Sequence, residues 1–419
     1  MSQRLVILGL GYVGLPLVEA AVETGWQVTG FDVSTAVVDG LNAGKSHVDD
    51  LSDATIAGLL AKGFTATTDD SVLADADVAV ICVPTPLADD GGPDLRAVLS
   101  ATRTIAKHLH KGMLVVLEST TYPGTTDEDV RPILEAGGLI AGTDFNLAFS
   151  PERIDPGNPV YGMRNTPKVV GGQTPACTDR CADFYGSFVE KVVRARGTRE
   201  AEAAKILENT FRHVNIALMN EMARFCHELG IDLWDVIDAA KTKPFGFMPF
   251  YPGPGVGGHC IPIDPNYLSY KVRADLGYPF RFVELAQEIN NTMPAYTVSR
   301  ISELLNERSK PLRGSRILLL GVTYKPDISD QRETPSRPVA DQLIAKGADV
   351  VFHDPHVKTW TVATGDLTCV DNLLDEVKRA DITVVLQTHT AYNFDEIAAA
   401  GGTIFDTRGK LRQAGVTRL

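Results

Sequence analysis

Residues 4–32 of the chain read RLVILGLGYVGLPLVEAAVETGWQVTGFD. An apolar run typical of a buried strand leads into three glycines, Gly9, Gly11 and Gly14, and a helix-forming stretch follows them. A second apolar strand then ends at Asp32, eighteen residues after Gly14. Strand, glycine-rich turn, helix and strand in this order predict the first βαβ unit of a parallel sheet.

The spacing of this segment predicts that it binds a dinucleotide. The first glycine makes the tight turn, the second lets the backbone approach a pyrophosphate, and the third lets the helix pack on the strand. The carboxylate of Asp32 would accept hydrogen bonds from ribose hydroxyls and repel a 2′-phosphate, which favours NAD over NADP. The predicted cofactor-binding residues of this segment are Gly9, Gly11, Tyr12, Val13, Gly14 and Asp32.

The same alternation of strands and helices continues on both sides of a central region. Further strands are expected at 75–84 and 112–120, and the final hundred residues repeat the pattern with strands at 315–324, 348–355, 380–388 and 401–409. Alternating strands and helices imply parallel pairing in doubly wound sheets. The predicted fold class is therefore α/β, with two Rossmann-like doubly wound domains joined by a long central helix and a helical dimerisation region.

The central region is expected to be helical. From about Thr198 to Leu229 there is no Gly or Pro, and Gly230 is a plausible C-cap. A second helical stretch over 280–306 contains Pro294, which is expected to kink or interrupt it. A helix of about 30 residues spans about 45 Å, enough to join two domains and carry a dimer interface. We therefore expect domains at 1–197, 198–308 and 309–419.

Composition limits the class of protein. The chain has 419 residues, 44% of them hydrophobic and 22% charged, with a net charge of −13. This is ordinary for a globular protein and argues against a broad nucleic-acid or anionic-membrane surface. No apolar run reaches about 18 residues, so no membrane span is expected. Gly9, Gly11, Gly14 and Glu19 interrupt the N-terminal apolar stretch, which argues against a signal peptide and favours a cytoplasmic protein.

Six cysteines without a secretory signal are expected to be reduced thiols. Cys177 and Cys181 lack a second pair or clustered histidines, so no zinc site, and no metal site in general, is expected. Cys260 is different, because Gly257 and Gly258 precede it in a loop rich in Pro and Gly and leave room around its sulfur. A thiol near a nicotinamide suggests nucleophilic attack on a carbonyl. The other cysteines, Cys82, Cys226 and Cys369 among them, fit small buried side chains, and His259 fits a structural role equally well.

Other polar residues occupy positions where such sheets bind ligands. Lys205 and Asn209 share one face of the long helix, although Glu202 and Glu208 could make Lys205 a solvated ion-pair residue. The remaining candidates follow strands or lie in a proline-flanked turn: Thr85, Glu118, Thr120 and Glu152.

Seven motifs occur in one order along the chain: VILGLGYVGLPL, CVPTP, EST, SPER, AKILENTFR, GGHCIPIDP and YKPDISDQRETP. With them the chain resembles the UDP-glucose/GDP-mannose dehydrogenase family of UDP-sugar 6-dehydrogenases over its whole length. The stretch PFYPGPGVGGHCIPIDP is most similar to the UDP-N-acetylglucosamine 6-dehydrogenase branch.

The resemblance implies a four-electron oxidation, in which two NAD⁺ convert the C6 alcohol of a UDP-sugar to a carboxylate. It implies that Cys260 forms a thiohemiacetal and then a thioester, and that Lys205 and Asn209 stabilise the oxyanion. The implied catalytic residues are Cys260, Lys205, Asn209, Asp264, Glu152 and Thr120. The implied additional cofactor contacts are Thr85, Thr120 and Arg332. The implied substrate contacts are Glu152, Arg153, Lys205, Asn209, Tyr251, Gly257, Tyr324, Lys325 and Arg408. The family also implies a homodimer or a higher homo-oligomer.

Four positions depart from the UDP-glucose branch: Val37, Pro156, Pro244 and Ile263. They argue against plain UDP-glucose and favour UDP-N-acetylglucosamine, with UDP-N-acetylmannosamine and UDP-glucose as alternatives. A two-electron NAD dehydrogenase that does not need Cys260, and a non-catalytic NAD-binding module, are the alternatives from other classes.

Overall fold

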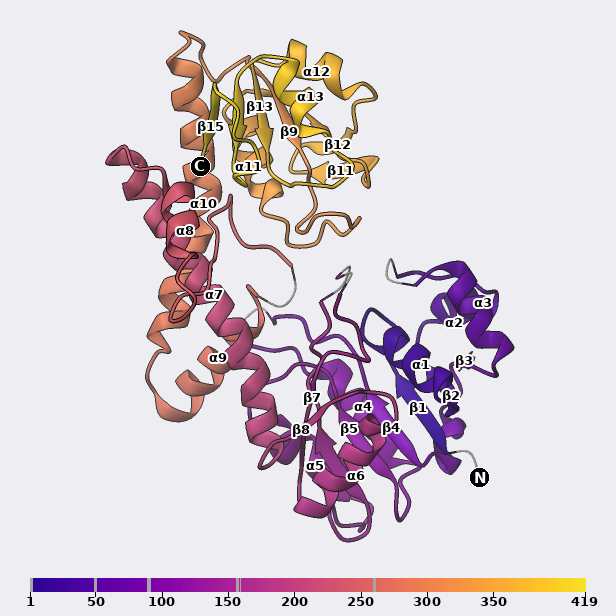
Figure 1. Ribbon diagram of the computed structural model, residues 1–419. Helices are drawn as coiled ribbons and strands as arrows, with labels where there is room; N and C mark the ends of the chain where they lie inside the picture. The colour runs from indigo at the N-terminus through magenta and orange to yellow at the C-terminus, as the bar shows by residue number, and fades with distance from the viewer. Residues whose placement is uncertain (1–2, 49–50, 89–91, 156–157, 159, 259–260) are drawn as a thin grey trace. The chain divides into compact units, whose positions relative to one another are not determined.

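The computed structural model describes residues 3–48, 51–88, 92–155, 158, 160–258 and 261–419. The chain forms two compact units (Figure 1). The N-terminal unit contains Met1–Glu208 and Asn266–Gly277, and the C-terminal unit contains Asn209–Pro265 and Tyr278–Leu419. The chain therefore enters the C-terminal unit, returns for one short helix, and leaves again.

An eight-stranded sheet in the order β3-β2-β1-β4-β5-β6-β7-β8 is the centre of the N-terminal unit. Its strands are β1 (Arg4–Leu8), β2 (Gln27–Phe31), β3 (Thr65–Thr67), β4 (Val78–Ile81), β5 (Leu114–Leu117), β6 (Asn146–Phe149), β7 (Lys168–Gly172) and β8 (Val192–Arg194). The order of the first six strands is that of a dinucleotide-binding fold, whose ligand lies past the carboxyl ends of β1 and β4. The predicted parallel sheet is confirmed from β3 to β6, whereas β7 runs antiparallel to β6.

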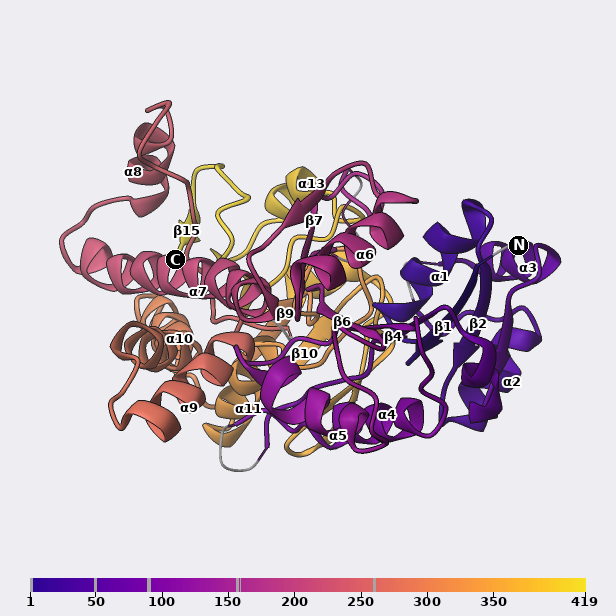
Figure 2. The same ribbon diagram turned by 90° about the horizontal axis from the view of Figure 1, so that it is seen from below.

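Helices cover both faces of this sheet. The helices of this unit are α1 (Gly14–Glu23), α2 (Thr35–Asn42), α3 (Asp53–Ala61), α4 (Arg96–Ala106), α5 (Arg131–Glu135), α6 (Pro175–Gly186) and the returning α9 (Asp264–Leu276), with short helical turns at Asp70–Asp75 and Thr126–Val130. Leu5 and Ile7 of β1 belong to a core shared with α1, α2, α3 and α6, and Val6 and Leu8 to a core shared with α4 and α5. Figure 2 shows α4 and α5 side by side. The alternation explains why β1 reads as an uninterrupted apolar run.

A second parallel sheet in the order β10-β9-β13-β14-β15 is the centre of the C-terminal unit. Its strands are β9 (Arg316–Leu320), β10 (Asp349–His353), β13 (Ile382–Val385), β14 (Ile404–Asp406) and β15 (Val416–Arg418), and an unpredicted hairpin is formed by β11 (Thr359–Val362) and β12 (Gly365–Thr368). The helices are α8 (Leu233–Ala240), α10 (Arg281–Asn306), α11 (Ser336–Ala345), α12 (Leu373–Arg379) and α13 (Phe394–Ala399). The strand order reverses between β9 and β13, which places a ligand-binding edge at their carboxyl ends.

The predicted long helix is confirmed as α7 (Thr198–Glu228), which both views show as one uninterrupted helix (Figures 1 and 2). Gly230 follows it with a φ of 68°, a left-handed conformation suited to glycine. The helix α10 continues through Pro294 without a break, so the interruption expected there is absent. Of the helices within the described residues, none is both long enough and apolar enough to cross a bilayer.

Candidate active site

The glycine-rich turn after β1 is shaped by close backbone contacts. A Cβ atom on Gly9 would lie 2.5 Å from the Cys82 carbonyl oxygen, and one on Gly14 would lie 1.9 Å from the Gly9 carbonyl oxygen. A Cβ on Gly11 would meet no atom within 4 Å. Gly9 and Gly14 are thus required for packing, whereas Gly11 borders open space at the start of α1, where a pyrophosphate would be accommodated.

Asp32 is oriented beside this turn. Its Oδ2 accepts a hydrogen bond from the Leu10 amide at 3.0 Å, and its Oδ1 accepts one from the Ser34 amide at 2.9 Å. The carboxylate therefore lies at the carboxyl end of β2, next to the glycine turn and half-exposed. Gly9, Gly11, Gly14 and Asp32 together fit a dinucleotide whose ribose meets Asp32.

The loops after β4 and β5 are joined by backbone contacts of two predicted residues. Thr85 Oγ1 donates to the Thr120 carbonyl oxygen at 2.9 Å. The Tyr267 hydroxyl of α9 donates in turn to the Thr85 carbonyl oxygen. Tyr267 was missed by the sequence analysis, although it comes two residues after the GGHCIPIDP motif, because nothing in that motif indicates that α9 returns to the N-terminal unit.

Glu152 lies in a buried cluster with two other charged residues. Its Oε1 accepts from the Ile154 amide, while its Oε2 is buried and accepts no hydrogen bond from any residue that the structure describes. Lys168 Nζ lies 3.6 Å from that Oε2 and donates to Oε1 of Glu118. The Tyr185 hydroxyl donates to Oε2 of Glu118 at 2.6 Å. Glu152 is therefore a buried carboxylate that lies against the Lys168 ammonium and the Glu118 carboxyl.

The two carboxyls of this cluster have opposite pKa shifts. Burial, reinforced by the negative charge of Glu152, outweighs Lys168 and raises the pKa of Glu118 to about 7. Burial also opposes ionisation of Glu152, but Lys168, the Glu118 carboxyl and the Ile154 amide more than offset it and hold the pKa of Glu152 below its ordinary value. Near neutral pH the cluster thus favours an ionised Glu152 and a proton on Glu118.

Lys205 is buried, and its Nζ donates to the Glu152 carbonyl oxygen. The two glutamates that could have paired with it have other partners. Glu202 accepts from the Gly124 and Thr126 amides at 2.6 and 2.9 Å, and Glu208 pairs with Arg153 at 2.6 Å. The interpretation of Lys205 as a solvated ion-pair residue is therefore not supported, and Arg153 lies against Glu208.

In the C-terminal unit, Asn209 Nδ2 donates to Asp264 Oδ2 at 2.6 Å, and both side chains are buried. Cys260 and His259 lie outside the described residues. The glycines just before them pack tightly, because a Cβ on either Gly257 or Gly258 would lie 2.8 Å from a side-chain atom of Tyr324. The segment that leads to Cys260 therefore packs on the loop that carries Tyr324 and Lys325.

Arg408 and Tyr251 flank the same segment. Arg408 Nε donates to the Leu386 carbonyl oxygen at 2.7 Å, and burial lowers the pKa of its guanidinium to about 10. A Cβ on Gly253 would lie 2.9 Å from Arg408 Nη1, so this glycine lies directly against the guanidinium. Tyr251 stacks on Trp234, with ring centroids 5.8 Å apart.

Arg332 borders a pocket of about 650 Å³ in this unit, together with Gly255, Val256, Asn290 and Pro335 among others. Its guanidinium also pairs with Asp330 at 2.6 Å. The pocket shows that the 331–335 segment of the YKPDISDQRETP motif borders open space next to the segment that precedes Cys260.

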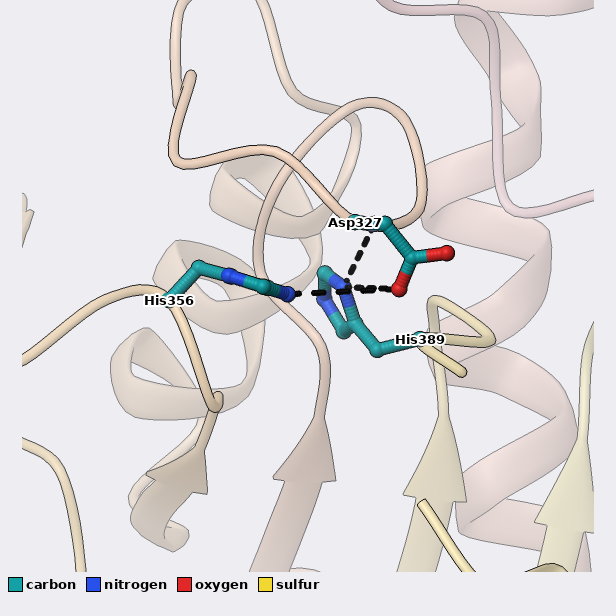
Figure 3. Close-up of side chains that lie close together, drawn as sticks. All are labelled: Asp327, His356 and His389. Carbon is teal, nitrogen blue, oxygen red and sulfur yellow. Dashed lines mark hydrogen bonds and ion pairs between the residues drawn. The ribbon is translucent and has the colours of Figure 1, made fainter. Parts of the chain in front are cut away.

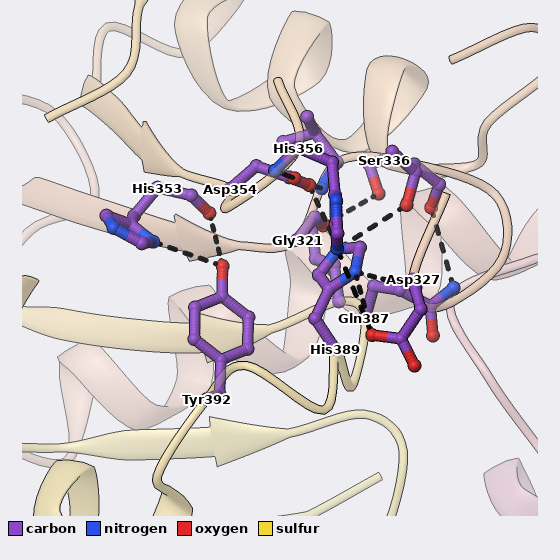
Figure 4. A network of polar contacts seen from close by, with 12 residues as sticks. Gly321, Asp327, Ser336, His353, Asp354, His356, Gln387, His389 and Tyr392 are labelled. Carbon is purple, nitrogen blue, oxygen red and sulfur yellow. Dashed lines mark hydrogen bonds and ion pairs between the residues drawn. The ribbon is translucent and has the colours of Figure 1, made fainter. Parts of the chain in front are cut away.

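A buried histidine connects the loop after β9 to two strands of its sheet (Figure 4). His389 Nε2 faces Asp354 Oδ2 at 3.0 Å, and the Asp327 amide donates to His389 Nδ1 at 2.9 Å. Because Nδ1 accepts a backbone proton, His389 is neutral with its proton on Nε2. The Val322 amide donates to the same Asp354 oxygen at 2.8 Å. These contacts hold the loop that carries Tyr324 and Lys325 at the carboxyl edge of the sheet.

Asp327, His356 and His389 point toward one another, as three metal ligands would (Figure 3). Asp327 Oδ1 lies 3.9 Å from both His356 Nε2 and His389 Nδ1. That carboxylate oxygen already accepts from the Thr390 amide at 2.7 Å and from its hydroxyl at 3.0 Å. Since the lone pair of His389 Nδ1 is also used, the arrangement is explained by hydrogen bonds and does not need an ion.

The chain matches three family models, described as the NAD binding domain (residues 3–189), central domain (199–292) and UDP binding domain (318–413) of the UDP-glucose/GDP-mannose dehydrogenase family. It is 37% identical to the UDP-N-acetyl-D-glucosamine 6-dehydrogenase of Pseudomonas aeruginosa, covering 84% of this chain and 83% of the relative. It is 35% identical to the Staphylococcus aureus protein CapL, and the match covers 98% of this chain and 96% of CapL.

Among solved structures, the UDP-D-ManNAc dehydrogenase of Pyrococcus horikoshii is similar with a TM-score of 0.89, 32% identity and coverage of 99% of this chain and 98% of that one. The UDP-glucose dehydrogenase of Pyrobaculum islandicum is similar with a TM-score of 0.86, 28% identity and coverage of 100% and 98%. The sheet order, the glycine-rich turn and the matches along the chain all indicate the same family. The chain belongs to the UDP-glucose/GDP-mannose dehydrogenase family.

Proposed function

We propose that the protein oxidises the C6 alcohol of a UDP-N-acetylhexosamine to the uronic acid, with UDP-N-acetyl-D-glucosamine as the favoured substrate. The observation that carries the proposal is the buried, ionised carboxylate of Glu152, whose main-chain carbonyl oxygen accepts from Lys205. An ionised carboxylate can take a proton, and a lysine held at the same turn can stabilise a developing oxyanion.

The cofactor would be NAD, held by Gly9, Gly11, Gly14 and Asp32, and it would take one hydride from the sugar in each of two oxidations. As the first hydride leaves, the C6 hydroxyl loses its proton to Glu152 or to a water next to it. The Cys260 sulfur would add to the resulting aldehyde carbon and form a thiohemiacetal. Oxidation of this adduct gives a thioester, which water hydrolyses to the carboxylate and the free thiol.

The other predicted residues fit supporting roles. Asn209, oriented by Asp264, would donate to the oxyanion one helical turn from Lys205. As the family resemblance implies, Tyr324, Lys325 and Arg408 would contact the nucleotide sugar, and Arg332 would contact NAD. The relatives named for N-acetylated sugars and the departures from the UDP-glucose branch favour an N-acetylhexosamine. UDP-N-acetyl-D-mannosamine is the first alternative.

The test is the NADH yield at completion with excess NAD⁺ and limiting UDP-N-acetylglucosamine, UDP-N-acetylmannosamine or UDP-glucose. We expect two NADH per sugar molecule with one of them, which identifies the substrate. One NADH would reduce the reaction to a simple alcohol oxidation and remove the covalent role of Cys260. The Cys260→Ser variant should still bind NAD but form almost no uronic acid, and normal uronic acid formation by it would contradict the mechanism.

We also propose that α7 forms a homodimer interface. Phe211, Leu218 and Phe225 recur every seven residues along it and are 45–48% exposed, and Leu229 is 69% exposed. Such an apolar stripe fits a second copy of the same helix. Sedimentation at micromolar concentration should give a dimer, and Leu218→Glu should shift it toward monomer, whereas Arg212→Glu at an exposed position off the stripe should not. A wild-type monomer would refute the interface.

A further inference from the structure

The position of Lys168 follows from the reversed strand. In the antiparallel register Phe149 pairs with Gly171 and Ala148 with Gly172, so the start of β7 lies at the carboxyl end of β6. The hydrogen bond from Ser150 Oγ to the Val169 carbonyl oxygen, at 2.8 Å, continues this register. A parallel β7 would place Lys168 at the opposite edge. The reversal therefore brings an ammonium group to the edge where Glu118 and Glu152 follow their strands.

The cluster has few other charges. The Lys168 and Glu118 side chains are 4% and 0% exposed, and that of Glu152 is 11% exposed. Four more titratable groups from the surrounding elements face the cluster: Cys82 after β4, Cys181 and Tyr185 of α6, and Lys205 of α7. Burial raises the pKa of the two thiols and of Tyr185, so these three stay neutral. Two carboxyls therefore share the charge of Lys168.

We propose that Lys168 is a positioning residue that keeps Glu152 ionised, so that Glu152 can take a proton from the substrate or a water, and that a protonated Glu118 leaves the Lys168 charge to Glu152. The inference rests on the proposed role of Glu152. In the proton step, the substrate or water O–H bond breaks, its proton bonds to Glu152 Oε2, and it later leaves to bulk water. The Lys168 ammonium favours that release, because it stabilises the carboxylate and not the acid.

Glu118 acts through the same ammonium. A protonated Glu118 leaves Lys168 paired only with Glu152, whereas an ionised Glu118 competes for it. Glu118→Gln imitates the protonated form, and Lys168→Met removes the charge at a similar side-chain length. Lys168→Arg keeps the charge.

The experiment measures kcat/KM against pH for the wild type and these three variants. The acid limb is the part of the profile where kcat/KM falls as the pH is lowered and Glu152 becomes protonated. In Lys168→Met this limb should move to higher pH by at least one unit, which lowers kcat/KM at a fixed pH on the limb by about tenfold or more. Lys168→Arg should reverse most of the shift, and Glu118→Gln should leave the limb in place, because Glu118 already carries a proton at that pH. An acid limb at the wild-type pH in Lys168→Met would overturn the proposal.

Glu202→Gln is the matched control. Burial raises the pKa of Glu202 to about 7 as it does for Glu118, but its partners are the amides of Gly124 and Thr126 and the Thr126 hydroxyl. This variant should alter stability and leave the acid limb in place. If Lys168 had only a structural role, Lys168→Met would likewise change stability and leave the acid limb in place.

A readout without substrate separates this proposal from the proposed function. Infrared titration of protein with ¹³C-labelled glutamate detects protonated carboxyls directly. On lowering the pH from neutral, Lys168→Met should protonate one carboxyl more than the wild type, in which Glu118 and Glu202 already contribute. A second change, Glu152→Gln, in the Lys168→Met background should remove that additional signal. If the wild type forms no NADH with any nucleotide sugar, the proposed function fails while this titration still decides the role of Lys168. If the protonated carboxyls titrate identically in the wild type and in Lys168→Met, the proposed role of Lys168 is wrong.

Discussion

Each sheet has a buried polar cluster past the carboxyl ends of its strands, but the two clusters differ in how their atoms are used. In the N-terminal unit, Glu118, Lys168 and Glu152 carry charge, and Glu152 Oε2 has no hydrogen bond from the described residues. In the C-terminal unit, both nitrogens of His389 and both oxygens of Asp354 have partners. The first arrangement leaves an atom for chemistry, and the second holds a loop.

This difference explains why similar residue types serve different purposes. An acceptor that is buried and unused costs stability, so a protein keeps one where a ligand or a proton will use it. A fully paired network makes a loop rigid instead. In this molecule the loop held by His389 carries Tyr324 and Lys325, so under the proposed function rigidity in one unit would serve binding and the Glu152 carboxylate in the other would serve proton transfer.

The largest effect should come from Glu152→Gln. It removes the free acceptor while retaining the oxygen that accepts from Ile154, so kcat/KM should fall by about 10²- to 10⁴-fold with little change in NAD binding. NADH formation and NAD titration measure the two quantities. Activity within a few-fold of the wild type would show that Glu152 has a structural role. Both clusters would then be structural, and the difference proposed between them would be wrong.

Asp354→Ala should affect stability most. It leaves His389 Nε2–H and two backbone amides without their acceptor and should cost about 3 kcal/mol in the free energy of unfolding, measured in urea. Burial opposes ionisation of Asp354, but the hydrogen bond from His389 and those from the amides offset it, so its pKa lies below the ordinary value. This stability is therefore present above about pH 4 and is lost as the pH falls through the lower folded pKa.

The matched control is Asp366→Ala, which removes an exposed carboxylate of the β11–β12 hairpin that accepts only from Thr361 Oγ1 among the contacts found. It should cost less than about 1 kcal/mol. If Asp354→Ala and Asp366→Ala lower the free energy of unfolding equally, burial of the His389 network does not contribute to stability.

Thr390→Val should have a smaller effect. It removes the hydroxyl that donates to Asp327 Oδ1 at 3.0 Å and retains the backbone donor. The expected loss is about 1 kcal/mol, because the contact is exposed and one partner remains. A larger loss in urea unfolding would show that the Asp327 loop depends on this hydroxyl more than on His389.

Added zinc should have no effect specific to the triad of Asp327, His356 and His389. A bound ion at a hundredfold excess over its dissociation constant would stabilise the protein by about 2.7 kcal/mol. We expect the same melting temperature with and without zinc, and the same small response in His356→Ala. A zinc-dependent rise in the wild type that His356→Ala abolishes would show that an ion displaces the Asp327 amide from His389.

Local sequence patterns predicted the long helix and eight of the described strands but missed seven others, namely β3, β6, β7, β8, β11, β12 and β15. The strands, the glycine turn and Asp32 were placed within a few residues, because side-chain periodicity and turn chemistry act over short distances. The strand β7 was not predicted, and its direction could not have been, since a strand reads the same in either orientation. The position of Lys168 was therefore not predictable either. The pairs Lys168–Glu118 and His389–Asp354 join residues 50 and 35 positions apart, which only the folded sheets bring together.

The return of α9 to the N-terminal unit has a consequence for synthesis. Tyr267 donates to Thr85, and Lys271 pairs with Glu128 at 2.7 Å, so the N-terminal unit lacks a helix until Gly277 has left the ribosome. The 69 residues between Glu208 and Gly277 take roughly 3–14 s to translate at about 5–20 residues per second. During that interval the nascent chain exposes the loops that α9 covers, which is when a chaperone would be most useful to it.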